Sequence, residues 1–443
     1  MNGTSSITHV LAGFSVAWIG HLDRLLPAGS LAVVDEPEII ERRRIGERVA
    51  PFRCVGAVIA APTQDEAGAE GLADVVSRPE GVRVVMPGVE YGVVAAAALA
   101  HAWGVPGAGL SAARTLRDKS ELRRAGERVG LPQPAWRVVE GPEDLARFRD
   151  GLGTREYVLK PTNRQASLGV QLLGPQDDVA QAWRIAVEAQ EPFLRAGYAQ
   201  AARYQAEERL HGPEVSVEAL VRAGDVVFFN ITAKQVQPGR HPVESGHSVP
   251  AAVSPEADRA LRHRMRDLIA ATEFHSGVLH AEWILVGDVE PHLIECAGRL
   301  PGDGIVELID LAYGGDLLAD LLHVLDVDGG DGRGPNGSSR PGLERRARRG
   351  AAVRFLSSAP GRVAAVDGVD AAGNAEGVHS VQVDVAEGTV VGEVTSSWSR
   401  AGEVVATGAD AAEAVRNTER AAALVEIVTA APAAAAAATD GTA

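Results

Sequence analysis

The chain has 443 residues, of which 46% are apolar, and it carries a formal net charge of -16. This length predicts about three domains, each able to bury a core. No apolar run approaches the ~18 residues that cross a bilayer, and no basic segment precedes an apolar one at the N-terminus, so we expect neither a membrane span nor a secretion signal. The negative charge argues against a nucleic-acid-binding surface but not against nucleotides.

Cysteine content indicates the compartment. Cys54 and Cys296 are the only two cysteines, too few for a disulfide framework or a zinc site. This agrees with a reducing environment, so we expect a cytoplasmic protein. The sequence does not locate a surface for self-association, and a homodimer is left open.

Residues 1–116 alternate short apolar runs with helical patterns, which predicts a small parallel α/β domain. A buried helix is expected from Tyr91 to Trp103, and strands are expected at 7–11, 31–34, 57–60 and 82–86. Neither G-x-G-x-x-G nor G-x-x-x-x-G-K-[ST] occurs, so no dinucleotide or P-loop site is assigned here. We interpret this part as a scaffold or substrate-side domain.

An amphipathic helix begins near Lys119 and ends in the Gly-Leu-Pro-Gln-Pro segment at 130–134. A strand, Tyr157 to Pro161, then carries Lys160 near its end and runs into a small polar loop at 162–170. Such a strand and loop can place an ammonium group and several backbone N–H groups around phosphates. A lysine at a strand end is also common at a solvated sheet edge, and the sequence leaves both interpretations open.

Polar residues line one face of the next expected strand pair, residues 204–218. After a Gly-Pro turn, Glu214, Ser216 and Glu218 alternate with Val215 and Val217. The polar side could simply be the wet face of an antiparallel sheet, and this alternative stays open for Ser216.

Two short apolar strands, 278–286 and 292–296, are joined by a turn and predict a β-hairpin with one acid in each strand, Glu282 and Glu295. A bound divalent cation would offset the cost of two facing acids, and oxygen ligands suit Mg²⁺ or Mn²⁺. Without metal the two acids would repel, so Gln at either position should melt at or above the wild-type temperature. Arg299 is near enough to hold a phosphate oxygen. The alternative is an edge hairpin with solvated acids.

The composition changes after residue 322. Residues 326–350 are rich in Gly, Asp, Ser and, at 345–349, Arg, which predicts a linker with a solvated charge run. Strands expected at 352–356, 361–366, 379–385 and 404–407, with a final helix at 409–428, indicate a small closing domain. The Ala-rich residues 429–443 predict a disordered tail.

Taken in order and spacing, these motifs resemble the ATP-grasp superfamily of carboxylate-amine ligases. The resemblance covers roughly 117–325, and segments 244–250 and 299–305 are most similar to the branch that includes L-amino acid ligases, which join unprotected amino acids into dipeptides. It implies a multidomain protein of α/β and α+β class with the ATP-grasp fold: a Rossmann-like domain (1–116), an ATP-grasp domain (117–325), a linker (326–350), a C-terminal α+β subdomain (351–428) and a tail (429–443).

The resemblance also implies ATP as a cofactor and a role for each matching residue. Lys119 and Lys160 match the lysines that hold the α- and β-phosphates, and the loop at 162–169 matches the lid over them. The remaining nucleotide contacts that it implies are loop residues Ser167 and Gly169, the adenine-amino acceptor Glu207, the adenine-edge backbone of Arg209 and Leu210, and the ribose acid Glu214.

For the reacting phosphoryl group, the resemblance implies Mg²⁺ or Mn²⁺ held by Glu282 and Glu295, with Arg299 steadying the transferred group. Many members carry Asn two residues after the second acid as a further metal ligand, whereas this chain has Ala297.

The proton of the incoming ammonium needs an acceptor, and the sequence offers several without choosing among them: Glu218, Lys234, Glu244 and His247. An imidazole titrates near neutral pH, but a lone His in a Gly-Ser-rich loop is also an ordinary surface residue. We therefore expect an ATP-dependent ligase that joins two amino acids through an acylphosphate and releases ADP and phosphate. The alternatives are a natural-product ligase for a non-proteinogenic acid or amine, and a nucleotide-binding regulatory protein without turnover.

Overall fold

The N-terminal part of the molecule is a parallel α/β layer, as the sequence predicted. The structure, a computed structural model, describes residues 6–191, 193–198, 202–237, 241–327 and 345–430. The parallel sheet has the strand order β3-β2-β1-β4. Its strands lie within two residues of the expected ranges: β1 (His9–Ala12), β2 (Leu31–Asp35), β3 (Val55–Ala60) and β4 (Val84–Pro87).

Helices flank this sheet. The expected buried helix is α5 (Val93–Trp103), which is apolar on nearly every side and packs against β4 and β1. The other helices are α1 (Val16–Leu25), α2 (Pro37–Arg42), α3 (Ile45–Val49) and α4 (Leu72–Val75), with 3-10 turns at Ala69–Gly71 and Glu90–Gly92.

Two helices lead from this layer into the rest of the chain, α6 (Leu110–Arg117) and α7 (Lys119–Arg128). The carboxylate of Asp118 accepts from the backbone N–H groups of Ser120 and Glu121, so it caps α7 and fixes where that helix begins.

A small antiparallel sheet follows, with the strand order β5-β8-β6-β7. Helices α8 (Pro142–Leu152) and α9 (Val179–Glu188) pack on it and close one apolar cluster. Its strands are β5 (Trp136–Val139), β6 (Tyr157–Pro161), β7 (Gln171–Leu173) and β8 (Tyr204–Glu208). The strand predicted to carry Lys160 is confirmed as β6.

The centre of the molecule is an antiparallel sheet with the order β13-β12-β9-β10-β11-β14-β18-β16. Helix α10 (Pro255–Thr272) covers one face, where Val215, Val217 and Trp283 join its apolar residues. Helices α11 (Ile305–Tyr313) and α12 (Leu317–Leu325) pack against the same sheet. The strands are β9 (Glu214–Arg222), β10 (Asp225–Val236), β11 (Glu244–Val249), β12 (Gly277–Val286), β13 (Glu290–Ala297), β14 (Gly350–Leu356), β16 (Val378–Val383) and β18 (Gly402–Gly408).

The C-terminal part differs from the sequence prediction in two places. The final helix is shorter, α14 (Ala411–Ala422), and the chain then forms strand β19 (Glu426–Ala430) in a three-stranded sheet with β15 (Gly361–Asp367) and β17 (Val390–Val391). Of the expected solvated charge run, Arg346, Arg348 and Arg349 are exposed, whereas Arg345 is half-buried, because it pairs with Asp320 and lies over the ring of Phe228. Short helix α13 (Val369–Gly373) and a 3-10 turn, Ser397–Ser399, complete this part.

Strands β11 and β14 are hydrogen-bonded neighbours, so the central sheet runs across the expected boundary at 350. The proposed domain limits therefore stay a prediction. Residues 328–344 of the expected linker and 431–443 of the expected tail lie outside the described residues. Within the described part, no helix is long and apolar enough to span a membrane.

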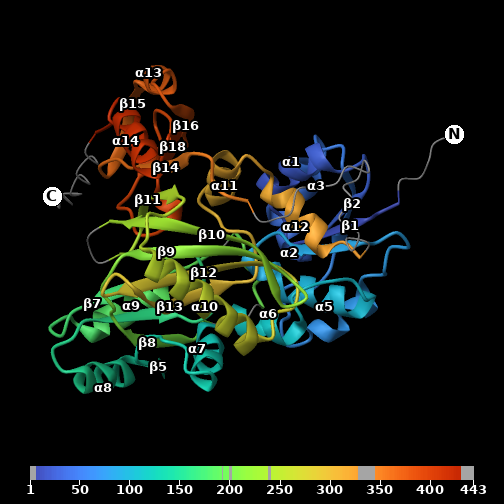
Figure 1. The fold of residues 1–443 in the computed structure, drawn as a ribbon, viewed down its shortest axis with the longest axis horizontal. Helices are drawn as coiled ribbons and strands as arrows, with labels where there is room; N and C mark the ends of the chain where they lie inside the picture. Colours follow the sequence, from blue (N-terminus) through green and yellow to red (C-terminus); the bar gives the residue numbers. More distant parts are fainter. Residues whose placement is uncertain (1–5, 192, 199–201, 238–240, 328–344, 431–443) are drawn as a thin grey trace, which may run out of the picture.

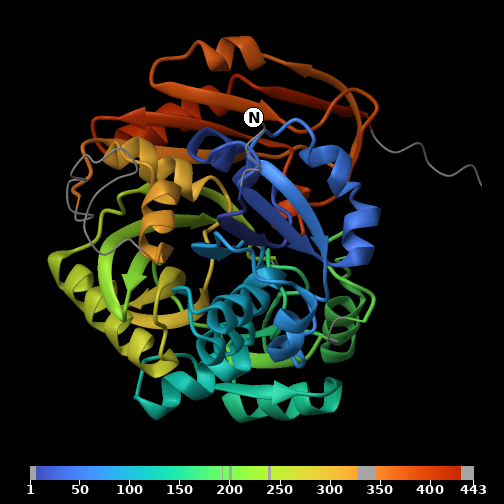
Figure 2. The ribbon, with the colours of Figure 1, turned by 90° about the vertical axis from the view of Figure 1, so that its right-hand side faces the viewer.

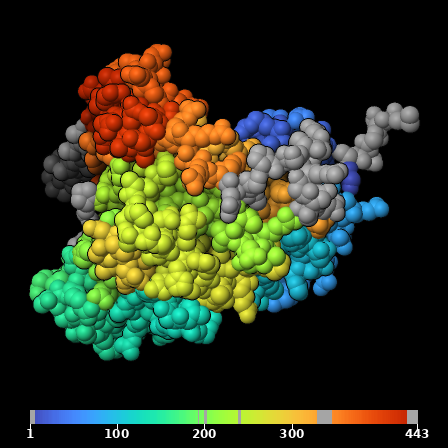
Figure 3. Space-filling model, viewed as in Figure 1, coloured from blue at the N-terminus to red at the C-terminus, as the bar shows by residue number. Residues whose placement is uncertain are grey.

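The sheets form a layered molecule. Figures 1 and 2 place the small sheet and the C-terminal elements at opposite ends, with the central sheet between them and the N-terminal layer beside it. Figure 3 shows the C-terminal elements as a lobe rising above the central body.

Candidate active site

A cavity of about 420 Å³ lies between the small sheet and the central sheet. Its walls come from β6 and β8 on one side and from β9, β10, β12 and β13 on the other. Most of the residues expected to hold a nucleotide line it, namely Lys119, Lys160, Ser167, Glu207, Arg209, Leu210 and Glu214, together with Glu282 and Glu295. Gly169 does not: with φ +74° it lies against the backbone of Ala186, outside the described lining of this cavity.

Lys160 is buried rather than solvated at a sheet edge, so that alternative is wrong. Its Nζ lies 2.7 Å from Oε2 of Glu207, and Oε1 of Glu207 accepts from Nε of Arg123 at 2.8 Å. Burial lowers the pKa of Lys160. Burial works to raise the pKa of Glu207, but Arg123 and Lys160 outweigh it and lower that pKa. Both oxygens of Glu207 are thus engaged by protein cations, and its expected role at the adenine amino group stays a prediction.

The hairpin is confirmed, and its two acids face each other. Glu282 and Glu295 are cross-strand partners, and both side chains line the cavity. Each is paired with a lysine: Nζ of Lys234 lies 2.9 Å from Oε1 of Glu282, and Nζ of Lys119 lies 3.0 Å from Oε1 of Glu295. The hairpin does lie at an edge of the central sheet, because β13 is its terminal strand. The alternative of solvated acids is nevertheless wrong, because both side chains line the cavity and each pairs with a lysine.

Lys234 is shared among three carboxylates. Its Nζ lies 2.5 Å from Glu214, 2.9 Å from Glu282 and 3.4 Å from Glu244. Burial works to lower the pKa of Lys234, but these acids outweigh it and raise that pKa well above its usual range. Burial works to raise the pKa of Glu282, but Lys234 and His280 outweigh it and hold that pKa well below its usual range. Each hairpin acid thus has a cationic partner that the sequence interpretation did not include, and the expected net repulsion between the two acids stays a prediction.

A second cavity, of about 450 Å³, adjoins the first. The two cavities share the side chains of Lys234, Glu244, Glu282 and Glu295 and the loop residues 165–167. The second cavity extends towards the N-terminal layer at Trp18 and the C-terminal part at Trp398. Four charged residues therefore form the boundary between the two cavities.

The structure contradicts the expectation that Glu218 faces the substrates. Glu218 is 0% exposed and lines neither cavity among the described residues. Its oxygens accept from Ser216, Asn230 and Thr232, and from Nδ1 of His280 at 2.9 Å. Ser216 is equally buried, so the wet-face alternative is wrong as well.

His280 is a site residue that the sequence interpretation missed. Its Nε2 lies 3.3 Å from Oε1 of Glu282 and its ring lines the second cavity. Burial works to lower its pKa, but hydrogen bonds with Glu218 and Glu282 outweigh it and raise the pKa of His280 to about 9. The sequence does contain a signal for this residue: His280 precedes Glu282 by two residues, and a strand places residues two apart on the same face.

His247 is also buried, in strand β11 rather than in the expected loop. Its ring lines the second cavity, with Nε2 3.5 Å from Oδ2 of Asp303. Asp303 in turn pairs with Arg400, whose guanidinium also donates to Glu244 at 2.8 Å and lies 3.7 Å from the ring centroid of Phe355. The C-terminal part thus supplies a cation that lies behind the wall of the second cavity and bridges two of its lining acids, Glu244 and Asp303. No local motif predicts this contact.

Arg299 lines the second cavity, as expected for a group near a phosphate, and the N-terminal layer holds it. Its Nε donates to Glu90 at 2.6 Å, and Arg117 donates to the same carboxylate at 2.7 Å. Burial works to raise the pKa of Glu90, but Arg299 and Arg117 outweigh it and lower the pKa to about 2. Glu90 is a second missed residue, an acid just before the buried helix α5.

The donor set fits a hard divalent cation. Glu282 and Glu295 present carboxylates from neighbouring strands to a shared space, and Cys296 points to the opposite, buried side of β13. Two carboxylates plus phosphate oxygens are a usual set for Mg²⁺.

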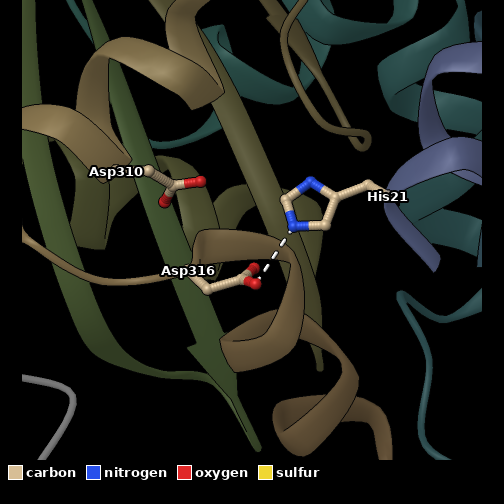
Figure 4. Close-up of side chains that lie close together, drawn as sticks. All are labelled: His21, Asp310 and Asp316. Carbon is tan, nitrogen blue, oxygen red and sulfur yellow. Dashed lines mark hydrogen bonds and ion pairs between the residues drawn. The ribbon is translucent and has the colours of Figure 1, made fainter. Parts of the chain in front are cut away.

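Another group of possible metal ligands lies away from both cavities (Figure 4). His21 of α1 bonds to Asp316 at 3.0 Å, and Asp310 lies beside them. Each carboxylate also accepts a backbone N–H of α12, from Leu317 and Ala319. Helix capping and the tie between α1 and α12 account for this group.

Family comparisons agree with the geometry. Residues 154–307 match the model of the ATP-grasp domain, and residues 354–430 match that of L-amino acid ligase C-terminal domain 2. The chain is 27% identical over 248 residues to the alanine--anticapsin ligase of Bacillus subtilis, a match covering 52% of each protein. The chain therefore spans about half the length of the curated relatives that it matches.

Solved structures share the fold over nearly the whole chain. The L-amino acid ligase from Bacillus licheniformis superposes with a TM-score of 0.73 at 18% identity, covering 97% of this chain and 100% of that one. A carboxyaminoimidazole ribonucleotide synthase from Aspergillus clavatus, complexed with ATP, gives a TM-score of 0.65 at 16% identity and covers 95% and 98%. At these identities the likeness shows the fold, and the expected fold class is confirmed.

Proposed function

Because this chain belongs to the ATP-grasp superfamily and resembles its L-amino acid ligase branch, we propose that it is an ATP-dependent carboxylate-amine ligase. It would join two amino acids by an amide bond through an acylphosphate and release ADP and phosphate. One observation supports this most: two cavities meet at Glu282 and Glu295. A phosphoryl donor on one side and a carboxylate on the other would then react at the shared wall.

In this proposal the first cavity takes ATP. Lys119 and Lys160 would neutralise the α- and β-phosphates, while Glu214 would accept from the ribose hydroxyls. The backbone of Arg209 and Leu210 would meet the adenine edge, and the loop around Ser167 would cover the phosphates. Support comes from the shared lining of these residues and from the burial of both lysines.

Mg²⁺, or Mn²⁺, would be held by Glu282 and Glu295 and would supply charge neutralisation at the phosphates. The carboxylate substrate would attack the γ-phosphorus, breaking the bond to the β-phosphate oxygen, so that ADP leaves and an acylphosphate forms. The amine of the second substrate would then attack the acyl carbon, expel phosphate and lose a proton. Arg299, fixed by Glu90, would steady the phosphoryl group during both steps.

His247 remains our candidate to receive the amine proton, because it is buried and lines the second cavity. The proposal includes a cytoplasmic protein, which the two free, buried cysteines support. A ligase for a non-proteinogenic acid or amine uses the same site and differs only in what fills the second cavity.

Phosphate release with a panel of amino acid pairs tests the proposal. We expect phosphate, ADP and one dipeptide to appear in equal amounts, and Glu282→Gln to abolish all three. Glu290→Gln is the matched control and should keep full activity, because this half-buried acid of the same hairpin pairs with Arg264 and lines neither described cavity. ATP binding without turnover for every pair would instead favour the regulatory alternative.

A further inference from the structure

The loop at 162–170 contributes to both cavities, because its residues 165–167 line the first as well as the second. Two consecutive non-glycine residues of this loop, Ala166 and Ser167, have φ angles of 57° and 56°. Residues with a Cβ rarely take this left-handed conformation, and they keep it only where surrounding contacts hold it. The contacts made by this loop therefore decide whether it stays in place at the two cavities.

A buried acid from another part of the chain holds the loop. Glu191, which follows the end of α9, is 4% exposed. Its Oε1 accepts from Nε2 of Gln165 at 3.0 Å, and its Oε2 accepts from the hydroxyl of Tyr91. Gln165 belongs to the loop, whereas Tyr91 belongs to the 3-10 turn that precedes α5 in the N-terminal layer. One carboxylate thus joins the loop to the N-terminal layer.

The segment that carries Glu191 is fixed by contacts of its own. Nε2 of Gln64, a residue of the N-terminal layer, donates to the carbonyl of Leu194 at 2.7 Å. Oε1 of the same Gln64 accepts from the backbone N–H of Ala196 at 3.0 Å. Because these bonds do not involve the loop, Glu191 keeps its position independently of the loop and can act as its anchor.

The second partner of Glu191 leads to the arginine of the second cavity. The guanidinium of Arg117 lies 5.0 Å from the ring centroid of Tyr91 and donates to Glu90 at 2.7 Å. Glu90 also accepts from Arg299. The residues that hold the loop and those that hold Arg299 therefore form one connected network.

We propose that Glu191 is a positioning residue that acts through Gln165 to keep the loop closed over the acylphosphate and to keep water away from it. The inference rests on the proposed function, which forms the acylphosphate where the two cavities meet. Water that attacked the acyl carbon would expel phosphate and return the free carboxylate, so that ATP would be consumed without an amide bond. A closed site limits this side reaction.

The first test compares phosphate with dipeptide, using the full chain, ATP, Mg²⁺ and an amino acid pair that turns over. In Glu191→Ala we expect the fraction of phosphate released without dipeptide to rise about tenfold, because losing a hydrogen bond to a charged group shifts an equilibrium by roughly that factor. A residue that only stabilised the fold would lower both products together. Glu191→Gln keeps one acceptor oxygen and should restore most of the coupling. Glu188→Ala removes an exposed acid at the end of α9 and is the matched control, with wild-type coupling expected.

The second test needs no turnover. Hydrogen-deuterium exchange of the free full chain, read by mass spectrometry, should be about tenfold faster at 162–170 in Glu191→Ala, while β12 and the Glu188→Ala variant exchange as in the wild type. Gln165→Ala should give the same increase. The double variant should exchange no faster than either single one, because both changes remove the same contact. Gln165→Ala also serves in both tests if circular dichroism shows that Glu191→Ala does not fold.

The outcomes separate the two proposals. Unchanged exchange of the loop in folded Glu191→Ala, or unchanged coupling of phosphate to dipeptide in that variant, overturns the role of Glu191 and leaves the ligase proposal standing. A wild type that forms no dipeptide with any amino acid pair overturns the proposed function, and with it the acylphosphate that the loop would cover.

Discussion

Replacing Glu282 by Gln should destabilise the metal-free protein. Oε1 of Glu282 lies 2.9 Å from Nζ of Lys234 and 3.3 Å from Nε2 of His280, and the side chain is 20% exposed. Breaking a buried ion pair by removing one partner commonly costs about 3–5 kcal/mol. Lys234 keeps Glu214 and Glu244, so the loss should be nearer to one charged hydrogen bond, about 2 kcal/mol.

The pH dependence of this loss has a definite sign. Lys234 and His280 outweigh the burial of Glu282 and hold its pKa well below the usual 4.5. A carboxyl with a lowered pKa stabilises the fold fully above its unfolded pKa and loses that contribution as the pH falls through the folded value. The difference between wild type and Glu282→Gln should therefore be full at pH 7 and shrink in acid.

Thermal melting in EDTA measures the loss of stability in Glu282→Gln. All variants are scanned at one rate, because a multidomain chain need not unfold in two states. Glu290→Gln is the matched control: it removes an acid from the same hairpin that pairs with Arg264 at the surface, so its cost should stay within ~0.5 kcal/mol. Adding Mg²⁺ and ATP at a hundredfold excess should stabilise the wild type by about 2.7 kcal/mol and Glu282→Gln by far less. A Glu282→Gln variant that melts at or above the wild type in EDTA would refute the stabilising pairing and show that repulsion between the two acids outweighs it.

Four further outcomes are expected. Lys160→Met should lower turnover about 10²- to 10³-fold while circular dichroism stays native, because Arg123 still pairs with Glu207. Chromatography of the spent nucleotide should show ADP, and AMP as the main product would contradict an acylphosphate route. Arg400→Lys should raise KM for an amino acid about tenfold or more without changing KM for ATP, since a lysine cannot bridge Glu244 and Asp303 as the guanidinium does. Burial raises the pKa of Asp310 to about 7, so the contribution of this carboxyl to stability falls as the pH rises from about 4 to 7. Asp310→Asn should therefore raise the melting temperature relative to the wild type at pH 8 but not at pH 4.

Local sequence predicted the elements that carry the site. The two hairpin acids, the strand that ends in Lys160 and the alternation of Glu214 with Val215 depend on period-two patterns over a few residues. Such patterns hold wherever one face of a strand is buried, so the strand positions could be predicted without coordinates. The family resemblance added the order of the motifs and, from that, the fold.

Tertiary structure decided how the charges in the site are paired. Ser216 and Glu218 alternate with valines, which is the pattern of a strand with one solvated face, yet both are buried. They are buried because β9 lies inside the central sheet, between β10 and β12, and β12 comes about sixty residues later in the chain. The domain limits also remained open, since β11 and β14 pair across the expected linker.

The acids at 282 and 295 would repel if only their own hairpin surrounded them, which is all that the sequence could assess. Lys234 from β10 and Lys119 from α7 each pair with one of these acids, so we expect the net electrostatic energy of the two acids to be favourable. Arg400 likewise pairs with Glu244, which is 156 residues earlier in the sequence. A short segment therefore fixes which side chains share a face, whereas the net electrostatic energy of a buried group depends on every charge within a few ångströms, and only the folded chain brings those charges together.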